Sequence, residues 1–579
     1  MRPALLDFPV RKSACLCLKT MVAEFAKFST VAPLLRLGSR GALPMTTLLS
    51  KINQWWTRHH GTAHRSPPNL WSATLLLPLA LRASAGELNL IPWPESVEVL
   101  PGQFALDAQT SVVADAPLAT AGEQLRTLLK LNSPSVNAPR RVLLTTNGAA
   151  NLGAEAYQLE VNSQGVILRA QTAAGAFYGS QTLRQLLNVD TRTLPAVKIT
   201  DAPRYVWRGL MLDVSRHFFD QATIFRLLDW MAEYKLNRFH IHLADDQGWR
   251  IAINQYPELT KLGATGNFTD TNAAPRFFTQ PELKEIVAYA ACRYIVVVPE
   301  IDMPGHAGAA TRAYPEIDGG VHTYHPAREA TYDFLQNMLR EVATIFPSPW
   351  IHFGGDEVNS SGWKNDPQIT EKLKAEGLQQ PQQLEGYFVR RMAKFISQQG
   401  RVPMGWDEIT AANPATNTVI FWWRQNKPEV LAQALAAGYP VVLTPRSPCY
   451  FDYPQDKSYQ NFSWKLFNTP EAVYDGPKIP APVTALQQKN ILGVEGCVWT
   501  ERIATVPYLE FMLLPRLTAL AEMAWTADSQ RDYGKFSARL QPRLEQFHQQ
   551  GIHPYNPAEP AESLREATAT KKNQPTASR

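Results

Sequence analysis

The chain has 579 residues, of which 45% are hydrophobic and 19% are charged, so it is long enough to bury a large core. This length favours roughly two to four domains, or fewer where one of them is a barrel. The net charge of +5 is small for a chain of this length, and it gives no reason to expect a nucleic-acid partner.

Residues 1–85 are predicted to be a leader that carries a secretory signal peptide. An apolar run over residues 70–81 follows basic residues and precedes Ala83-Ser84-Ala85, which has the A-x-A pattern of a cleavage site. The run is shorter than the roughly 20 apolar residues that span a bilayer. We therefore expect a secreted or periplasmic protein with no integral membrane segment after signal removal. A short buried helix is the alternative interpretation of this run.

Residues 86–203 are predicted to form a small α+β domain. Two alternating runs, residues 157–161 and 166–170, flank the turn-forming residues 162–165 and indicate a β-hairpin. Leucines at helical spacing follow over residues 183–187. Few acids or histidines cluster in this segment, so we assign it no catalytic chemistry.

The segment 204–555 alternates short apolar runs with amphipathic stretches, one of which follows a capping box from Thr279 to Glu282. Strands that are buried on both faces and alternate with helices indicate a parallel sheet. Eight such units predict an α/β fold of the (β/α)8 barrel type. An open doubly wound sheet is the alternative, but no glycine-rich phosphate loop follows the first strand. The eight runs begin at Gly209, Arg238, Tyr294, Trp350, Val402, Thr418, Pro440 and Ile491.

Two further features concern the end of the chain and its thiols. Residues 556–579 are polar and rich in proline and alanine, and we expect them to be disordered.

Outside the leader only Cys292, Cys449 and Cys497 remain, and their spacing fits neither a disulfide framework nor a zinc site. We expect them to be free, buried thiols.

Carboxylates, histidines and several of the 15 Trp gather at the predicted carboxyl ends of the strands. The loops at that end of a barrel build its active site, so this convergence favours one functional site. The segments concerned are residues 213–217, 245–249, 300–306, 356–357, 406–408, 422–423 and 499–501.

Each of these residues also has a structural explanation when it is taken alone. A strand-end Asp is often a helix N-cap, and His240 and His242 could be hydrogen-bonded core histidines. Asp246 and Glu300 could be partners of Arg216 or Arg250. A packing role between domains would explain Trp207.

Two kinds of chemistry compete for this site. Histidines such as His306 and His352 could bind a metal, but no HExxH or comparable tight pair appears, so we predict no metal. Paired acids with tryptophan walls instead indicate glycoside hydrolysis. The acids Asp356 and Glu357 are adjacent, however, and can hardly flank a sugar from opposite sides, as a retaining pair about 5 Å apart does. The second carboxylate must therefore have another task.

Six motifs of this domain closely resemble those of the family-20 glycoside hydrolases, the β-N-acetylhexosaminidases and chitobiases. In chain order they are DVSRHFF, FHIHLADDQGWR, PEIDMPGHAGAA, HFGGDE, GWDE and GVEGCVWTE, and the resemblance covers residues 87–550. It implies an exo-acting enzyme that hydrolyses terminal β-linked N-acetylglucosamine (GlcNAc) or N-acetylgalactosamine with retention. The substrate would be an oligosaccharide or glycoconjugate, and no cofactor is implied.

The resemblance also implies substrate-assisted catalysis, in which the 2-acetamido oxygen attacks the anomeric carbon and forms an oxazolinium intermediate. It makes Glu357 the general acid and later the base, and Asp356 the acceptor of the acetamido N–H. A general acid near neutral pH needs a raised pKa, which the neighbouring anion and a dry, tryptophan-lined pocket would supply.

Other roles carry over from the same resemblance. Tyr450 should orient the acetamido oxygen, while Asp245 and His306 should form a relay behind Glu357. Trp406, Trp423 and Trp499 should wall the N-acetyl group and the ring, and Arg216, Asp452 and Glu501 should bind sugar hydroxyls.

Two alternative functions remain open on sequence grounds. A carbohydrate-binding protein on an inactive barrel would be favoured by the loss of an acid or of Tyr450, but these residues are present. A disaccharide-releasing relative would need a roomier pocket near Arg216 and Glu501.

Overall fold

A computed structural model describes residues 88–131, 138–457, 466–480 and 482–569. The predicted leader and its signal run lie outside these residues, as does the end of the chain from residue 570. Among the residues that are described, no helix combines the length and the apolar character needed to cross a membrane.

The first part is a six-stranded sheet in the order β1-β6-β4-β5-β3-β2, on which two helices pack. The predicted hairpin is confirmed, because β4 and β5 pair antiparallel and Asn162 Oδ1 accepts hydrogen bonds from the N–H groups of Gln164 and Gly165. The strands are β1 (Ser96–Ala105), β2 (Thr110–Ala114), β3 (Arg140–Thr145), β4 (Tyr157–Asn162), β5 (Gly165–Ala170) and β6 (Thr193–Asp201), and the helices are α2 (Ala119–Leu128) and α3 (Ala173–Leu186).

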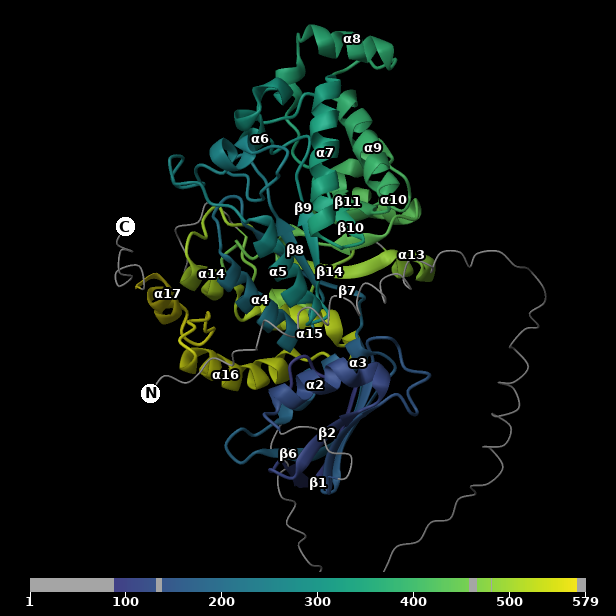
Figure 1. Ribbon diagram of the computed structural model, residues 1–579, viewed down its shortest axis with the longest axis vertical. Helices are drawn as coiled ribbons and strands as arrows, with labels where there is room; N and C mark the ends of the chain where they lie inside the picture. Colours follow the sequence, from purple (N-terminus) through teal and green to yellow (C-terminus); the bar gives the residue numbers. More distant parts are fainter. Residues whose placement is uncertain (1–87, 132–137, 458–465, 481, 570–579) are drawn as a thin grey trace, which may run out of the picture. The chain divides into compact units, whose positions relative to one another are not determined.

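The second part is a closed barrel of eight parallel strands, in the order β10-β11-β12-β13-β14-β7-β8-β9 (Figure 1). All eight predicted strands are present, and the (β/α)8 prediction is confirmed. They are β7 (Trp207–Asp213), β8 (Arg238–His242), β9 (Val296–Glu300), β10 (Trp350–His352), β11 (Val402–Trp406), β12 (Val419–Trp422), β13 (Val441–Leu443) and β14 (Ile491–Val498).

Helices follow most barrel strands, and the capping box at the start of α5 is formed as predicted: Thr279 Oγ1 accepts from the Glu282 N–H, and Glu282 accepts from the Thr279 N–H. The helices are α4 (Gln221–Glu233), α5 (Gln280–Ala291), α6 (Gly308–Ala313), α7 (Glu329–Ile345), α8 (Pro367–Ala375), α9 (Gln383–Gln398), α10 (Pro428–Ala436), α11 (Arg446–Cys449), α12 (Pro470–Asp475), α13 (Ala485–Asn490), α14 (Val506–Leu513), α15 (Arg516–Trp525), α16 (Tyr533–Gln549) and α17 (Pro560–Ala569). Shorter turns include η3 (Leu259–Gly263), η5 (Ser360–Trp363) and η6 (Asp407–Ala412).

Helix α17 corrects the prediction of a disordered tail for residues 560–569. It contacts α14, and the Ser563 hydroxyl donates to the Glu559 carbonyl while it accepts from the Asn556 N–H. Proline and alanine suggested disorder by composition, but this proline occupies the first helical position, where its missing N–H costs nothing.

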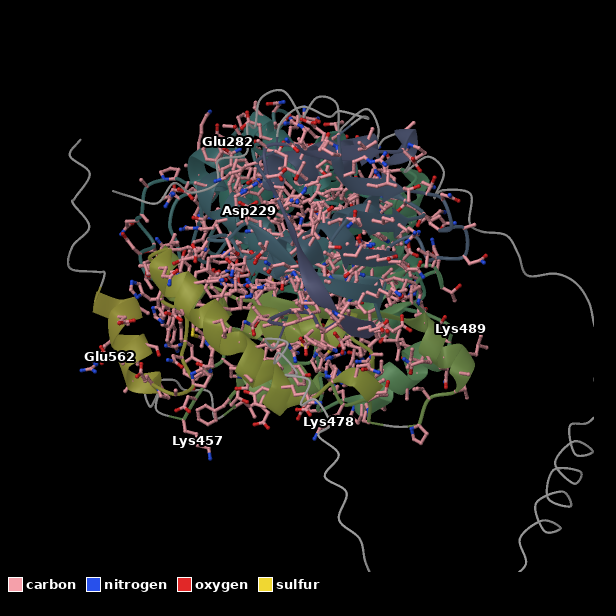
Figure 2. The ribbon with its side chains drawn as sticks, turned by 90° about the horizontal axis from the view of Figure 1, so that it is seen from below. Asp229, Glu282, Lys457, Lys478, Lys489 and Glu562 are labelled. Atoms are coloured by element: carbon pink, nitrogen blue, oxygen red, sulfur yellow. The ribbon has the colours of Figure 1, made fainter. Side chains whose placement is uncertain are left out.

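The barrel interior is unusually polar for a fold whose centre is normally filled by branched aliphatic side chains. Trp207 lies inside it and not between domains: its indole N–H donates to Glu495 Oε2 at 2.9 Å, and its ring packs edge-on against Phe421. By contrast with these buried polar groups, exposed charged residues such as Lys489 and Glu562 project outward from helices (Figure 2).

Cys449 and Cys497 are buried thiols as expected, whereas Cys292 is only half-buried.

Candidate active site

The acidic pair follows β10 across a Gly-Gly turn that requires glycine. Gly354 and Gly355 have φ of 69° and 97°, and a Cβ on Gly354 would lie 1.7 Å from Asp302 Oδ1. Glu357 is itself left-handed, with φ of 48°, which is uncommon outside glycine. Because the strand alternation is broken here, Asp356 and Glu357 both turn toward His306, whose Nε2 lies 3.5 Å from Asp356 Oδ2 and 3.9 Å from Glu357 Oε2.

The two acids differ sharply in exposure. The Asp356 side chain is 13% exposed and the Glu357 side chain is 61% exposed. The expected dry pocket around Glu357 is therefore not formed, although the expected neighbouring anion is present. The buried acid suits charge stabilisation, and the exposed acid suits proton exchange with substrate and water.

A chain of charges stands behind the pair, as predicted for Asp245 and His306. Asp245 lies 2.7 Å from Arg216 Nη2 and 3.3 Å from His306 Nδ1. Although burial opposes ionisation, Arg216 and His306 hold the pKa of Asp245 well below its usual range. Burial also opposes the charge on His306, but Asp245 and Asp356 raise the pKa of His306 well above its usual value. The imidazole is therefore a cation between carboxylates.

Asp302 is a site residue that sequence reasoning did not select. Its Oδ1 accepts the Gly355 N–H at 3.2 Å, and no other described group bonds to its buried Oδ2 or to the buried Oδ1 of Asp356. Burial and the Asp356 charge raise the pKa of Asp302 well above its usual range. Despite burial, His306 and a hydrogen bond from Asp302 lower the pKa of Asp356. Asp302 is thus the protonated member of the pair, and Asp356 the anion.

Aromatic rings enclose the space beside the acids. Trp499 lies 5.7 Å from Trp406 and 6.0 Å from Tyr450 between ring centroids, and Tyr450 stacks on Trp423 at 6.2 Å and 13°. Trp406, Tyr450 and Trp499 belong to one buried apolar cluster, and the partly buried Trp423 packs against it. Burial raises the pKa of Tyr450 well above its usual value, so its hydroxyl remains a hydrogen-bond donor.

The predicted hydroxyl-binding residues lie together beside Trp499. The Arg216 guanidinium stands 5.0 Å from the Trp499 ring centroid, and its Nε is buried without a partner among the described residues. Burial and then Glu501 raise the pKa of Asp452 to about 8. Burial also raises the pKa of Glu501, in spite of Arg216. The buried Asp452 Oδ1 has no described partner either. These groups are suited to bind polar hydroxyls.

Some alternatives for single residues are settled by their contacts. His240 and His242 are buried, hydrogen-bonded histidines. The suggestion that Glu300 and Asp246 pair with Arg216 or Arg250 is wrong. Glu300 contacts imidazoles and the Trp406 indole, and Asp246 accepts the Gly308 N–H at 3.0 Å. Arg216 pairs with Asp245, and Arg250 donates to backbone carbonyls such as those of Ala264 and Gly266.

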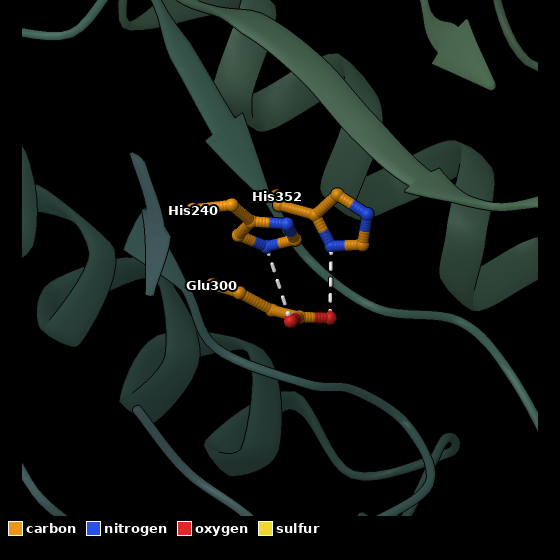
Figure 3. A group of neighbouring side chains, drawn as sticks. All are labelled: His240, Glu300 and His352. Atoms are coloured by element: carbon orange, nitrogen blue, oxygen red, sulfur yellow. Dashed lines mark ion pairs between the residues drawn. The ribbon is translucent and has the colours of Figure 1, made fainter. Parts of the chain in front are cut away.

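Several histidine and carboxylate groups are close enough together to hold a cation. In one of them His240, Glu300 and His352 each place one ligand atom within 4.8 Å of the others (Figure 3). Glu300 lies 3.1 Å from His240 Nε2 and 2.9 Å from His352 Nδ1. Although burial opposes its charge, Glu495 and Glu300 raise the pKa of His240 to about 9, whereas burial lowers the pKa of His352. The ion pair between His240 and Glu300 therefore accounts for this grouping without a bound cation.

Glu408, on η6, is a second residue that sequence reasoning missed. Its Oε2 accepts the Trp423 indole N–H at 2.9 Å, and its Oε1 lies 3.4 Å from Arg424. Burial first, then Asp407 and Asp356, raise the pKa of Glu408 from 4.5 to about 9. The motif GWDE placed this acid at a strand end, but only the structure shows that it fixes a tryptophan of the site.

Glu408→Gln is expected to make the protein less sensitive to alkaline pH. Because folding raises this pKa, the native state retains a proton that the unfolded chain releases, and stability is lost as pH rises from 4.5 through about 9. Glutamine cannot ionise and keeps an acceptor for Trp423. Melting temperatures at pH 6 and pH 9 should therefore differ by several degrees less in the variant than in the wild type. Equal losses in both proteins would contradict the assignment.

A closed barrel whose carboxyl end carries a buried acid, an exposed acid and a cluster of tryptophan rings has the features of a glycoside hydrolase active site. The description "Glycosyl hydrolase family 20, catalytic domain" matches residues 205–528, and "Glycosyl hydrolase family 20, domain 2" matches residues 87–202. The chain therefore belongs to glycosyl hydrolase family 20, as its motifs predicted.

Individual relatives agree with this membership. A β-N-acetylhexosaminidase of Cellulomonas fimi is 35% identical over 78% of this chain and 93% of its own length. A β-hexosaminidase of Porphyromonas gingivalis is 32% identical over 81% of this chain, which spans only 64% of that relative. An exo-β-N-acetylglucosaminidase of Vibrio harveyi, solved with N-acetylglucosamine, superposes with a TM-score of 0.75 at 29% identity over 81% of this chain and 78% of its own.

Proposed function

We propose that the protein is an exo-acting, retaining β-N-acetylhexosaminidase that removes one terminal β-linked GlcNAc or N-acetylgalactosamine from an oligosaccharide or glycoconjugate. The observation that carries this proposal is the geometry of the acidic pair. Asp356 Oδ2 and Glu357 Oε2 both lie beside Nε2 of His306, so these two acids cannot flank a glycosidic bond. The nucleophile is supplied by the 2-acetamido group of the substrate.

The reaction proceeds in two displacements. In the first, Glu357 protonates the leaving oxygen while the acetamido oxygen bonds to the anomeric carbon and the glycosidic bond breaks. Asp356 accepts the acetamido N–H and stabilises the positive charge of the oxazolinium, and Tyr450 donates a hydrogen bond that orients the acetamido group. In the second, Glu357 takes a proton from water, whose oxygen opens the oxazolinium. Two inversions leave the anomeric configuration unchanged.

The charged residues next to Asp356 and Glu357 support these separate roles for the two acids. His306 is held as a cation beside both acids, and Asp302 donates a hydrogen bond to Asp356. Asp356 therefore remains an anion beneath the position of the developing charge, where low polarity strengthens its effect. Glu357 is free to exchange its proton. The Vibrio harveyi enzyme, with its bound N-acetylglucosamine, supports the choice of sugar.

The direct test compares 4-nitrophenyl β-GlcNAc with 4-nitrophenyl β-glucoside, which has the same leaving group and lacks the acetamido group. Intramolecular nucleophiles reach effective concentrations of about 10⁵ M or more, so the glucoside should be cleaved at least about 10³-fold more slowly. Comparable rates would contradict the proposal. No turnover of either compound would favour a carbohydrate-binding protein on an inactive barrel.

The length of product distinguishes the proposal from a disaccharide-releasing relative. Chitotetraose should yield GlcNAc and chitotriose as the first products, because we assign the neighbouring Arg216, Asp452 and Glu501 to the hydroxyls of a single terminal sugar. Chromatography of the products over time is the measurement, and early release of chitobiose would instead show a longer pocket. The biological role that we propose for this activity is the breakdown of chitin fragments or glycans.

Tyr450→Phe is expected to lower kcat for the aryl GlcNAc substrate by about 10²- to 10³-fold, with a small change in KM. Loss of one preorganised donor has this size where the donor acts chiefly in the transition state. Tyr474→Phe on α12, which removes a buried hydroxyl bonded to Glu522, is the control for general destabilisation. An unaltered kcat in Tyr450→Phe would remove this tyrosine from the mechanism.

Export from the cytoplasm is a further part of the proposal. It is supported by the apolar run over residues 70–81 and the Ala83-Ser84-Ala85 pattern. Expression of the full chain in its native host, followed by cell fractionation and N-terminal sequencing, should recover a mature protein that begins near Gly86. Recovery of the whole leader on cytoplasmic protein would contradict export.

A further inference from the structure

The barrel interior contains a buried ionic network that the mechanism above does not use. Its members come from four strands: His240 and His242 on β8, Glu300 on β9, His352 on β10 and Glu495 on β14, all essentially unexposed. A carboxylate buried at this depth is strongly destabilising unless several donors compensate it. The network therefore needs a reason beyond filling space, which aliphatic side chains would do.

Glu300 lies at the centre of this network. The parallel register places it directly opposite His242 on β8 and His352 on β10. Its Oε2 is 2.6 Å from His242 Nδ1, and its Oε1 accepts the Trp406 indole N–H at 2.9 Å. His240 Nε2 and His352 Nδ1 also lie near this carboxylate, at 3.1 Å and 2.9 Å (Figure 3). The His242 imidazole and the Trp406 indole hydrogen-bond to this carboxylate, and the positive charge of the nearby His240 compensates its own charge further.

Two contacts lead from Glu300 to the active site. Through His242, whose Nε2 lies 3.2 Å from Asp245 Oδ2, it reaches the carboxylate that contacts both Arg216 and His306. Through the indole it fixes Trp406, whose ring lies 5.7 Å from Trp499. One buried carboxylate thus holds a wall of the acetamido recess and the base of the relay behind the acidic pair.

We infer that Glu300 is a positioning residue for the reaction. It holds the Trp406 ring and the His242–Asp245–His306 chain at the relative positions that the reaction requires. This inference rests on the proposed function, because Trp406 is assigned to the acetamido group and the His242–Asp245–His306 chain is assigned to the general acid. Glu300 is fully buried. It acts on the geometry and the charge of the residues that we assign to the sugar and to proton transfer.

The protonation states agree with this role. Although burial opposes its charge, His352, His242 and His240 hold the pKa of Glu300 well below its usual range. Glu300 and Asp245 in turn raise the pKa of His242 despite burial. The titratable groups that face Glu300 are His240 and His242 on β8, His352 on β10, Cys497 on β14, Asp302 beyond β9 and Asp356 beyond β10. Removal of this anion favours proton loss from the acids above it.

Glu495 provides a matched control in the same network. Its carboxylate accepts the Trp207 indole N–H at 2.9 Å and lies 2.8 Å from His240 Nδ1. Like Glu300 it is a buried acid bonded to one indole and one imidazole, but neither partner is a predicted site residue. A structural role predicts the same behaviour for Glu300→Gln and Glu495→Gln, whereas a positioning role predicts different behaviour.

The experiment measures kcat, KM and their pH profiles with 4-nitrophenyl β-GlcNAc for wild type, Glu300→Gln and Glu495→Gln, together with melting temperatures. Both variants should melt at lower temperature, since each leaves a buried imidazole without its carboxylate. Only Glu300→Gln should lose about 10²-fold in kcat, the effect of a small misplacement of catalytic groups. Its alkaline limb should also move to lower pH, while Glu495→Gln keeps the wild-type profile.

Equal kcat losses in the two variants, or wild-type kcat and pH profile in Glu300→Gln, would overturn the inference. If Glu300→Gln does not fold, Glu300→Asp provides the test. This variant keeps the negative charge, but its shorter side chain moves the carboxylate away from His242 and Trp406. It should lose kcat without a shift of the alkaline limb, and unchanged kcat would overturn the inference. An inactive wild type would instead defeat the proposed function itself.

Discussion

Glu357→Gln is expected to lower kcat for 4-nitrophenyl β-GlcNAc by about 10²- to 10⁴-fold, the usual contribution of general acid catalysis. Glutamine has nearly the same shape but no proton to give. Because the Glu357 side chain is 61% exposed and packs against little, the melting temperature should be unchanged. Glu371→Gln, at an exposed acid on α8, is the matched control and should retain wild-type kcat.

The leaving group provides a second test of the same assignment. A 2,4-dinitrophenyl aglycone leaves without protonation, so the first step of Glu357→Gln should recover with this substrate and a burst of dinitrophenol should precede slower turnover. The defect then lies in the second step, where Glu357 acts as base. Undiminished turnover of the nitrophenyl substrate by Glu357→Gln would contradict its assignment as the acid.

Asp356→Asn is expected to lower kcat by about 10²- to 10³-fold for a different reason. The variant removes the anion that lies beneath the oxazolinium charge. Its defect should therefore persist with the dinitrophenyl aglycone, because acetamido attack is still required when leaving-group protonation is not. The two variants are thus separated by one change of substrate.

His306 should report the loss of Asp356 directly. Asp245 and Asp356 raise the pKa of His306 against the effect of burial, so this pKa should fall in Asp356→Asn and the imidazole should deprotonate at lower pH. NMR of a histidine-labelled protein measures this change. An unshifted His306 titration, or full recovery of Asp356→Asn with the dinitrophenyl substrate, would contradict the role given to Asp356.

Much of the architecture follows from local pattern. Apolar runs such as the one before Asp356 are buried on both faces, and their alternation with amphipathic helices is sufficient to predict a parallel barrel. The same reasoning places Asp245, His306 and Glu357 at one end, because each lies in the loop that follows a strand. Strand ends are local features, and the barrel brings them together by closure alone.

The relations across the barrel could not be read in this way. The bond between Glu300 and His242 depends on the register of β9 against β8, and the hydrogen bond from Asp302 to Asp356 depends on two turns meeting. The bond from Trp423 to Glu408 joins two successive units. Exposure of Glu357 depends on its left-handed backbone, which no pattern in the sequence signals. Each of these is set by tertiary packing.

The central claim is that the acetamido oxygen of the substrate is the nucleophile. The most direct measurement is kcat for 4-nitrophenyl β-GlcNAc and its N-fluoroacetyl, N-difluoroacetyl and N-trifluoroacetyl analogues. Each fluorine withdraws electron density from the carbonyl oxygen and weakens it as a nucleophile, while the leaving group stays the same. We predict that log kcat falls steeply and steadily along the series. A kcat independent of fluorination would show that the acetamido oxygen does not attack, and would contradict this mechanism.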